Sequence, residues 1–196
     1  MHTLPRFSVD CDIVIKDKKE LKKIKEVLKK IGYQKIEESK KSTPYHGTFV
    51  RYEKEIEKGF KVSMDIFIEK VLDRQTGAVL DAKWIFENAI DQDLKGKTFQ
   101  EKLKAKVTTR DALIIMKLLS CRETDIRDIF MILPGVTDLS FIKNEINKRT
   151  NFEKQYDKLK NKVLSKDFKD NLQGVFGFLP EATFEKHKES VLKLLK

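Results

Sequence analysis

Three aspartates lie at the centres of two segments with strand-like patterns. Asp10 and Asp12 belong to residues 6–15 (RFSVDCDIVI), and Asp65 belongs to residues 60–68 (FKVSMDIFI). Because side chains alternate between the two faces of a strand, Asp10 and Asp12 share one face and Asp65 opposes the apolar positions of its own segment. If the two strands are neighbours, three carboxylates converge on one patch of sheet. Such a cluster repels itself unless a cation binds there, and its hard oxygen ligands suit Mg²⁺ or Mn²⁺.

A plainer interpretation exists for each of these residues. Any single aspartate on the polar side of a strand can be a solubilising surface residue, but aspartate is depleted in strands, so three at strand centres need a reason. Lys117 interrupts the apolar run around it and is either a site residue or a surface lysine with a packed stem. Asp125 and Asp128 are three positions apart, which puts both on one helical face, where they can meet Lys117 or Arg122. The three histidines are scattered and have no metal-ligand spacing.

Composition bounds the class of protein. The 196 residues carry a net charge of +10, which favours polyanionic partners such as nucleotides or RNA, or else marks a solvated lysine-rich surface. The two cysteines, Cys11 and Cys121, lack CxxC spacing and are expected to be reduced, with Cys11 in the core. No apolar run is long enough for a membrane span, so we expect a soluble cytoplasmic protein without a membrane partner.

The order of patterned segments predicts an α+β fold, with a mixed, mostly antiparallel sheet followed by a C-terminal helical region. Strands are expected at 6–15, 33–37, 46–53 and 60–68, the last two forming a hairpin at Lys58-Gly59, with 78–80 pairing back on the sheet. Helices are expected at 16–31 (closed by Gly32), near 84–89, and at 109–119 (capped by Thr108), 124–133, 139–149, 151–164 and 180–195. Residues 91–97 and 171–179 are expected to be loops, and the predicted domains are 1–80 and 81–196.

Three pieces of this sequence, in this order, resemble the nucleotidyltransferase superfamily, the DNA polymerase beta-like fold. The pieces are the segment with Asp10 and Asp12, the segment with Asp65, and residues 109–129 (TRDALIIMKLLSCRETDIRDI). The last piece is similar to the helical motif of the minimal and AbiEii-type members, in which a lysine on one helix precedes an aspartate pair on the next. The resemblance covers roughly residues 6–133.

The resemblance implies an activity and a set of roles. Members transfer a nucleoside monophosphate from an NTP to an acceptor and release pyrophosphate, with two metal ions clamping the attacking and leaving oxygens. Asp10 and Asp12 would bind Mg²⁺ or Mn²⁺, and Asp65 would be the third carboxylate and help to activate the attacking hydroxyl. Arg6 and Ser8 would contact the substrate or support the site. Lys117 would contact the triphosphate, and Asp125 or Asp128 would hold Lys117 in position.

One departure from the family leaves an alternative function open. The family places a Gly-Ser or Gly-Gly turn upstream of the aspartate pair, whereas the nine residues before Asp10 contain no glycine. The alternative is therefore a catalytically inactive module of the same fold that binds a nucleotide or RNA. The expected partners are an NTP, an acceptor that is RNA, a protein or a small molecule, and, for a toxin-like member, a cognate inhibitor protein.

Overall fold

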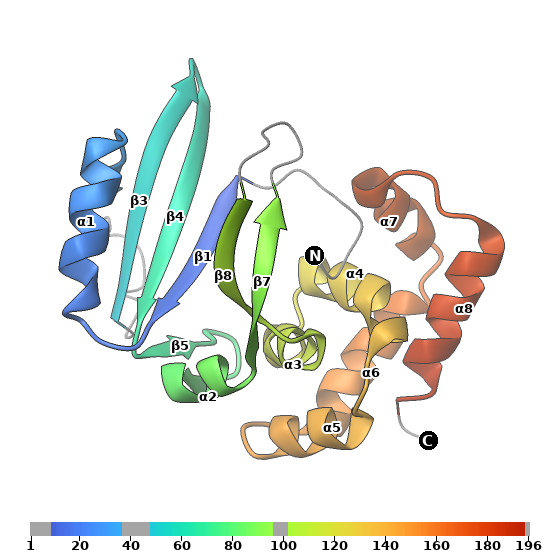
Figure 1. Ribbon diagram of the computed structural model, residues 1–196. Coiled ribbons are helices and arrows are strands. Elements are labelled where there is room, and N and C mark those ends of the chain that lie inside the picture. The colour runs from blue at the N-terminus through green and yellow to red at the C-terminus, as the bar shows by residue number, and fades with distance from the viewer. Residues whose placement is uncertain (1–8, 37–47, 96–101, 195–196) are drawn as a thin grey trace. The chain divides into compact units, whose positions relative to one another are not determined.

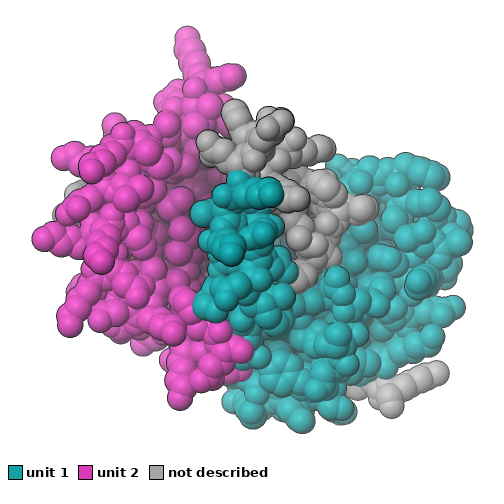
Figure 2. Space-filling view, viewed as in Figure 1, with its two compact units in different colours: residues 1–6, 88–196 teal, residues 7–87 magenta. Residues whose placement is uncertain are grey.

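The structure is a computed structural model that describes residues 9–36, 48–95 and 102–194. The chain divides into two compact units, residues 7–87 and residues 88–196 together with 1–6 (Figure 2). The predicted domain boundary after residue 80 falls inside a strand, β6 (Val79–Asp81), so the first unit continues through the helix that follows, α2 (Ala82–Glu87). No helix among the described residues is long and apolar enough to cross a membrane.

The first unit is built on a four-stranded mixed sheet, as the α+β prediction required. Its strands, in spatial order, are β1 (Asp10–Ile15), β4 (Phe60–Ile68), β3 (Thr48–Glu57) and β2 (Gln34–Ile36). β1 runs parallel to β4, while the other two pairings are antiparallel (Figure 1). The predicted hairpin between β3 and β4 is confirmed, and Gly59 in its turn has the positive φ of +81° that glycine adopts without strain.

Helix α1 (Glu20–Lys30) covers one face of this sheet (Figure 1). Its buried Leu21 and Leu28 pack with apolar side chains from three strands, namely Ile15, Tyr52, Ile66 and Ile68. The predicted end of the helix is confirmed at Gly32, where φ is +89°. Because these core residues alternate with the aspartates, α1 fixes which face of the sheet carries the acidic side chains.

Cys11 does not belong to this core, although its strand position predicted that it would. The core-facing positions of β1 become more covered along the strand, from exposed Cys11 through half-buried Ile13 to buried Ile15. The hydrophobic core therefore covers only the second half of β1, and Cys11 lies in the exposed first half.

A small hairpin follows β4. β5 (Lys70–Leu72) pairs with β6 as a separate two-stranded sheet, so the prediction that residues 78–80 return to the main sheet is wrong. The turn is held by Asp73, whose Oδ2 accepts hydrogen bonds from the backbone and the hydroxyl of Thr76 at 2.7 and 2.6 Å. This local bonding makes the hairpin self-contained.

The second unit begins with a hairpin that the sequence reading missed. β7 (Ala89–Lys95) and β8 (Lys102–Thr108) pair in an antiparallel arrangement, where residues 91–97 had been expected to be a polar connection. Asp91 lies opposite Lys106 and Asp93 lies opposite Lys104, and Lys106 Nζ reaches Asp91 Oδ1 at 3.3 Å. Cross-strand pairs of this kind stabilise a strand whose own composition is too polar to predict one.

The rest of the unit is helical. The helices are α3 (Arg110–Ser120), α4 (Glu123–Ile132), η1 (Leu133–Gly135), α5 (Leu139–Asn147), α6 (Phe152–Val163), α7 (Phe168–Phe176) and α8 (Glu181–Leu192). The N-cap of α3 is Thr109, which accepts a hydrogen bond from the Ala112 amide, rather than the predicted Thr108. α7 replaces most of the loop predicted at 171–179, because Phe168 and Leu172 bury one side of it completely.

Candidate functional site

The parallel pairing of β1 with β4 brings the predicted carboxylates together. Asp12 lies directly opposite Asp65, and Asp10 lies opposite Ser63. Paired residues of neighbouring strands project from the same face, so all three aspartates occupy the face away from α1. The prediction that the two acidic strands are neighbours is confirmed. Asp10 and Asp12 are exposed, whereas Asp65 is 7% exposed.

Asp65 is held by a residue that the sequence reading did not single out. Arg51 lies opposite Asp65 on β3. Its Nε donates to Oδ1 of Asp65 at 2.7 Å and its Nη2 donates to Oδ2 at 2.5 Å. This two-pronged pairing uses both carboxylate oxygens and is among the stronger hydrogen-bonded ion pairs in proteins.

The electrostatics of the face follow from this pair. The hydrogen bond to Asp65 raises the pKa of Arg51, against the opposing effect of burial, and the nearby charges of Asp10 and Glu53 raise it further. The guanidinium therefore stays charged and balances part of the acidic face. Asp10 is stabilised separately, because its Oδ1 accepts a hydrogen bond from the Ser63 hydroxyl at 2.5 Å.

The fit of this face to a metal ion is partial. Among the described residues, no group of three or more histidine, cysteine or acidic side chains is arranged to hold a metal. Asp10 and Asp12 supply oxygen donors of the kind that Mg²⁺ and Mn²⁺ prefer. Asp65 differs from these two aspartates because both of its oxygens accept hydrogen bonds from Arg51. Arg6 and Ser8, the predicted supporting residues, lie outside the described part of the chain.

The second predicted group assembles in the other unit, between α3 and α4. Lys117 Nζ lies 3.3 Å from Asp125 Oδ1 and 2.6 Å from Asp128 Oδ2. Asp125 also accepts from the Arg122 side chain at 2.8 Å and from the Arg122 amide at 3.2 Å, which ties it to the start of α4. The expectation that these carboxylates meet Lys117 or Arg122 is thus confirmed, and the ammonium joins two helices.

Burial makes this cluster more than a surface ion pair. Asp125 and Asp128 are each 3% exposed. The side chain of Lys117 is 20% exposed, so its positive charge lies at the edge of the helical core. A buried carboxylate is costly without a charged partner, and Lys117 is the partner that the two aspartates share. Its contacts in this structure are those of a residue that fixes the packing of α3 on α4.

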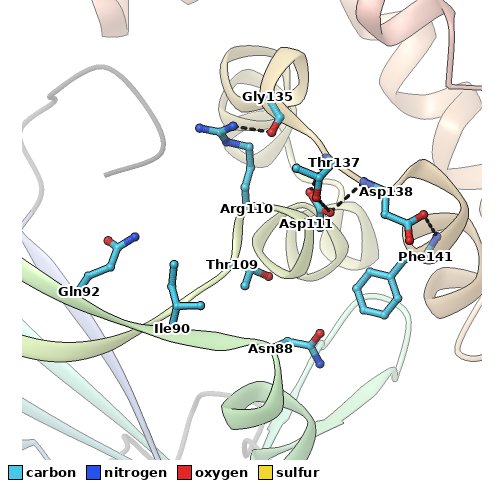
Figure 3. A pocket seen from close by; sticks show the side chains of 10 residues that line it. All are labelled: Asn88, Ile90, Gln92, Thr109, Arg110, Asp111, Gly135, Thr137, Asp138 and Phe141. Carbon is cyan, nitrogen blue, oxygen red and sulfur yellow. Dashed lines mark hydrogen bonds between the residues drawn. The ribbon is translucent and has the colours of Figure 1, made fainter.

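A hollow of about 710 Å³ lies at the start of α3, wholly within the second unit (Figure 3). None of the predicted site residues lines it; its lining is Asn88, Ile90, Gln92, Thr109, Arg110, Asp111, Gly135, Thr137, Asp138 and Phe141. Arg110 Nη1 donates to the carbonyl of Gly135 at one side. Asp111 accepts from the Thr137 hydroxyl at 2.7 Å and from two backbone amides, so its carboxylate holds the turn before α5.

No protein-family model and no curated protein matches the chain.

Proposed function

We propose that the protein is a metal-dependent nucleotidyltransferase-like protein that transfers a nucleoside monophosphate from an NTP to a hydroxyl acceptor. The observation that carries the proposal is the register of β1 and β4, which places Asp12 against Asp65 with Asp10 on the same face. RNA is the favoured acceptor, because the net charge of +10 attracts a polyanion. The pairing of Lys117 with Asp125 and Asp128 within the second unit gives further support, because the third sequence piece implied that these residues meet.

Each residue would have one role in this reaction. Asp10 and Asp12 would hold Mg²⁺ or Mn²⁺, which when bound neutralises phosphate charge. Asp65 would accept the proton of the attacking hydroxyl as a general base. Lys117 would keep α3 and α4 in place through Asp125 and Asp128.

A second candidate is a non-catalytic module of the same fold that binds a nucleotide or RNA. The observation that favours it is the pairing of Arg51 with both oxygens of Asp65, which gives this carboxylate a structural role in the sheet. The two candidates differ in whether Asp65 also acts on a hydroxyl.

The test is label transfer from each of the four α-labelled NTPs, with Mg²⁺ or Mn²⁺, to bulk RNA. Transfer should be lost in Asp10→Asn and Asp12→Asn and retained in Asp81→Asn, which removes an exposed carboxylate from β6 of the same unit. Fluorescence of the single tryptophan, Trp84, checks that the first unit is folded in each variant. Absence of transfer together with NTP-dependent thermal stabilisation supports the second candidate. Transfer that persists in both aspartate variants would rule out the first.

A further inference from the structure

Helix α1 and its flanks carry more than half of the net positive charge of the chain. Residues 16–35 contain nine lysines and three acidic residues, a net charge of +6 out of the +10 of the whole chain. Seven of these lysines lie between positions 18 and 30, and all seven are exposed: Lys18, Lys19, Lys22, Lys23, Lys25, Lys29 and Lys30.

The helical repeat gathers most of this charge on the side of α1 that points away from the sheet (Figure 1). Leu21 and Leu28 are buried against the sheet, so the positions opposite them face solvent. These positions, the outer face of α1, are Lys19, Lys22, Lys23, Glu26 and Lys30. The outer face therefore holds four ammonium groups and one carboxylate.

The lysines of α1 are not neutralised by their neighbours. Among the residues that the structure describes, none of the seven lysines at positions 18–30 forms an ion pair. The helix α8 shows the contrast, because Lys188 pairs with Glu185 at 3.1 Å and Lys193 pairs with Glu189 at 3.3 Å. Surface lysines elsewhere in the chain are thus matched with acids one turn away, whereas α1 presents an uncompensated positive field to the solvent.

The lysines at the start of α1 oppose the stability of the helix. Lys19, Lys22 and Lys23 lie at the N-terminal end, where the helix dipole disfavours positive charge. Lys19 and Lys23 are also four positions apart, a spacing at which like charges destabilise a helix. Lys29 and Lys30 differ, because they lie in the last turn, where the dipole favours them. An anionic partner on the outer face would relieve the repulsion at the N-terminal end.

We propose that the outer face of α1 binds the phosphate backbone of double-helical RNA without reading its base sequence. Lysine ammonium groups are flexible point charges that suit phosphate, whereas paired hydrogen bonds to bases come chiefly from arginine, asparagine and glutamine, which α1 lacks. Single strands are typically bound by stacking on aromatic side chains, and α1 has none. The inference deepens the proposed function and rests on it for the choice of RNA, the acceptor favoured there.

The sheet separates this surface from the acidic face of the same unit. Asp10 and Asp12 project from the face of the sheet that α1 does not cover. A phosphate backbone on α1 therefore lies away from their negative charge. The outer face of α1 would anchor the RNA, while the acidic face would act on its hydroxyl.

An anionic membrane is a second polyanionic surface that attracts lysines. A helix that binds a membrane inserts its apolar side into the lipid. In α1 that side is already used, because Leu21 and Leu28 are packed in the core of the unit. The exposed Val27 and Ile31 are two side chains only, and binding of this kind scales with the apolar area that enters the lipid. Duplex RNA requires no insertion and fits the surface better.

The experiment measures binding of the full chain to a fluorescein-labelled RNA duplex by anisotropy over a series of salt concentrations. The test variant is Lys19→Gln/Lys22→Gln/Lys23→Gln, and glutamine has nearly the helix propensity of lysine, so α1 is retained. Each lost phosphate contact should make the plot of log affinity against log salt shallower by about 0.9. The slope should therefore decrease by about 2.7, and the affinity at low salt should fall about tenfold or more.

The matched control removes the same number of charges from α8 and the residue that follows it. Lys186→Gln/Lys188→Gln/Lys193→Gln should change the salt slope by less than about 0.9, the effect of a single contact. Arginine at the three positions of the test variant keeps the charge and should keep the wild-type affinity and slope. The test variant should also melt no lower than the wild type, because the lysines that it removes oppose the helix dipole.

Several results would overturn the inference. An unchanged salt slope in the test variant, or an equal decrease in the α8 control, would remove α1 as the binding surface. A preference of about tenfold or more between two duplexes of equal length, the size that one base-specific contact gives, would exclude recognition by phosphate alone. Tighter binding of single-stranded RNA, duplex DNA or anionic lipid vesicles than of duplex RNA would overturn duplex RNA as the partner.

Binding and transfer are measured separately, so the two proposals can fail independently. Loss of duplex binding in the test variant alone would establish the surface even if no NTP is used. NMP transfer by the wild type, with equal duplex binding in the wild type and the test variant, would leave the transferase standing and remove the α1 surface.

Discussion

Replacement of Lys117 by methionine tests whether the buried cluster between α3 and α4 is held by one ammonium. Methionine keeps a long unbranched side chain, so the packing of the stem is retained. Asp128, which is 3% exposed, loses its 2.6 Å ion pair with Lys117. Asp125 loses a contact of 3.3 Å but keeps the one to Arg122 at 2.8 Å. The change therefore removes the ammonium that the two buried carboxylates share, and Asp128 loses the shorter of the two contacts.

The expected loss of unfolding free energy follows from the ion pairs that the substitution removes. Removal of one partner of a buried ion pair costs about 3–5 kcal/mol. The cost here should lie at the low end, about 3 kcal/mol, because Lys117 retains some solvent contact and Asp125 retains Arg122. For a chain of this length, that loss corresponds to a decrease in melting temperature of about 6–12 °C.

The assay is urea unfolding followed by far-ultraviolet circular dichroism. The matched control is Lys193→Met, because Lys193 pairs with Glu189 on an exposed stretch where both side chains are more than half exposed, so its loss should cost no more than about 0.5 kcal/mol. The double variant Lys117→Met/Asp128→Asn should recover about half of the loss, because the amide removes a buried negative charge. A cost for Lys117→Met no larger than that of Lys193→Met would refute the buried-cluster argument, as would a double variant that is less stable than Lys117→Met.

Three further predictions concern the same unit. Asp111→Ala removes a buried acceptor of three hydrogen bonds and should lower the unfolding free energy by about 3 kcal/mol, with Asp111→Asn costing less, as measured by urea unfolding. Burial lowers the pKa of His187 in the folded state. Its contribution to stability is therefore complete above the unfolded pKa of about 6.5 and is lost as the pH falls below that value. His187→Gln should flatten this part of a plot of unfolding free energy against pH, and an unchanged plot would contradict the argument. Burial raises the pKa of the Cys121 thiol to about 11. Partial burial and the charges of Asp12 and Asp65 also raise the pKa of the Cys11 thiol, but Cys11 is exposed and Cys121 is buried. A thiol reagent should therefore modify Cys11 first in the folded protein and both cysteines in urea.

Local periodicity was enough to predict the elements of the acidic face. Alternation in residues 9–15 and 60–68 separates the aspartates from the apolar side chains, and burial of the apolar set behind α1 leaves little freedom for the strands to turn over. The same holds for Asp125 and Asp128, because the helical repeat places both on the side that Lys117 approaches.

Some segments could not be predicted from local pattern. α7 contains Gly174, which disfavours a helix, but burial of Phe168 and Leu172 outweighs that preference. β7 is too polar to be recognised alone and becomes a strand because β8 supplies its hydrogen bonds and opposite charges. In each segment the deciding interaction comes from a residue distant in sequence.

The partner of Asp65 was decided by a single irregularity in the sheet. Glu57 pairs with Phe60 across the turn, and continuation of that register would place Tyr52 opposite Asp65. The register shifts by one residue between Glu55 and Glu57, so Arg51 takes the position instead. A one-residue shift exchanges the two faces of a strand, which sends Tyr52 into the core and Arg51 to the acidic face. The sequence by itself determined that Asp10 and Asp12 share a face and that each aspartate lies opposite the apolar side of its strand. Only the tertiary structure determined that β4 lies beside β1 and that an arginine stands among the three carboxylates.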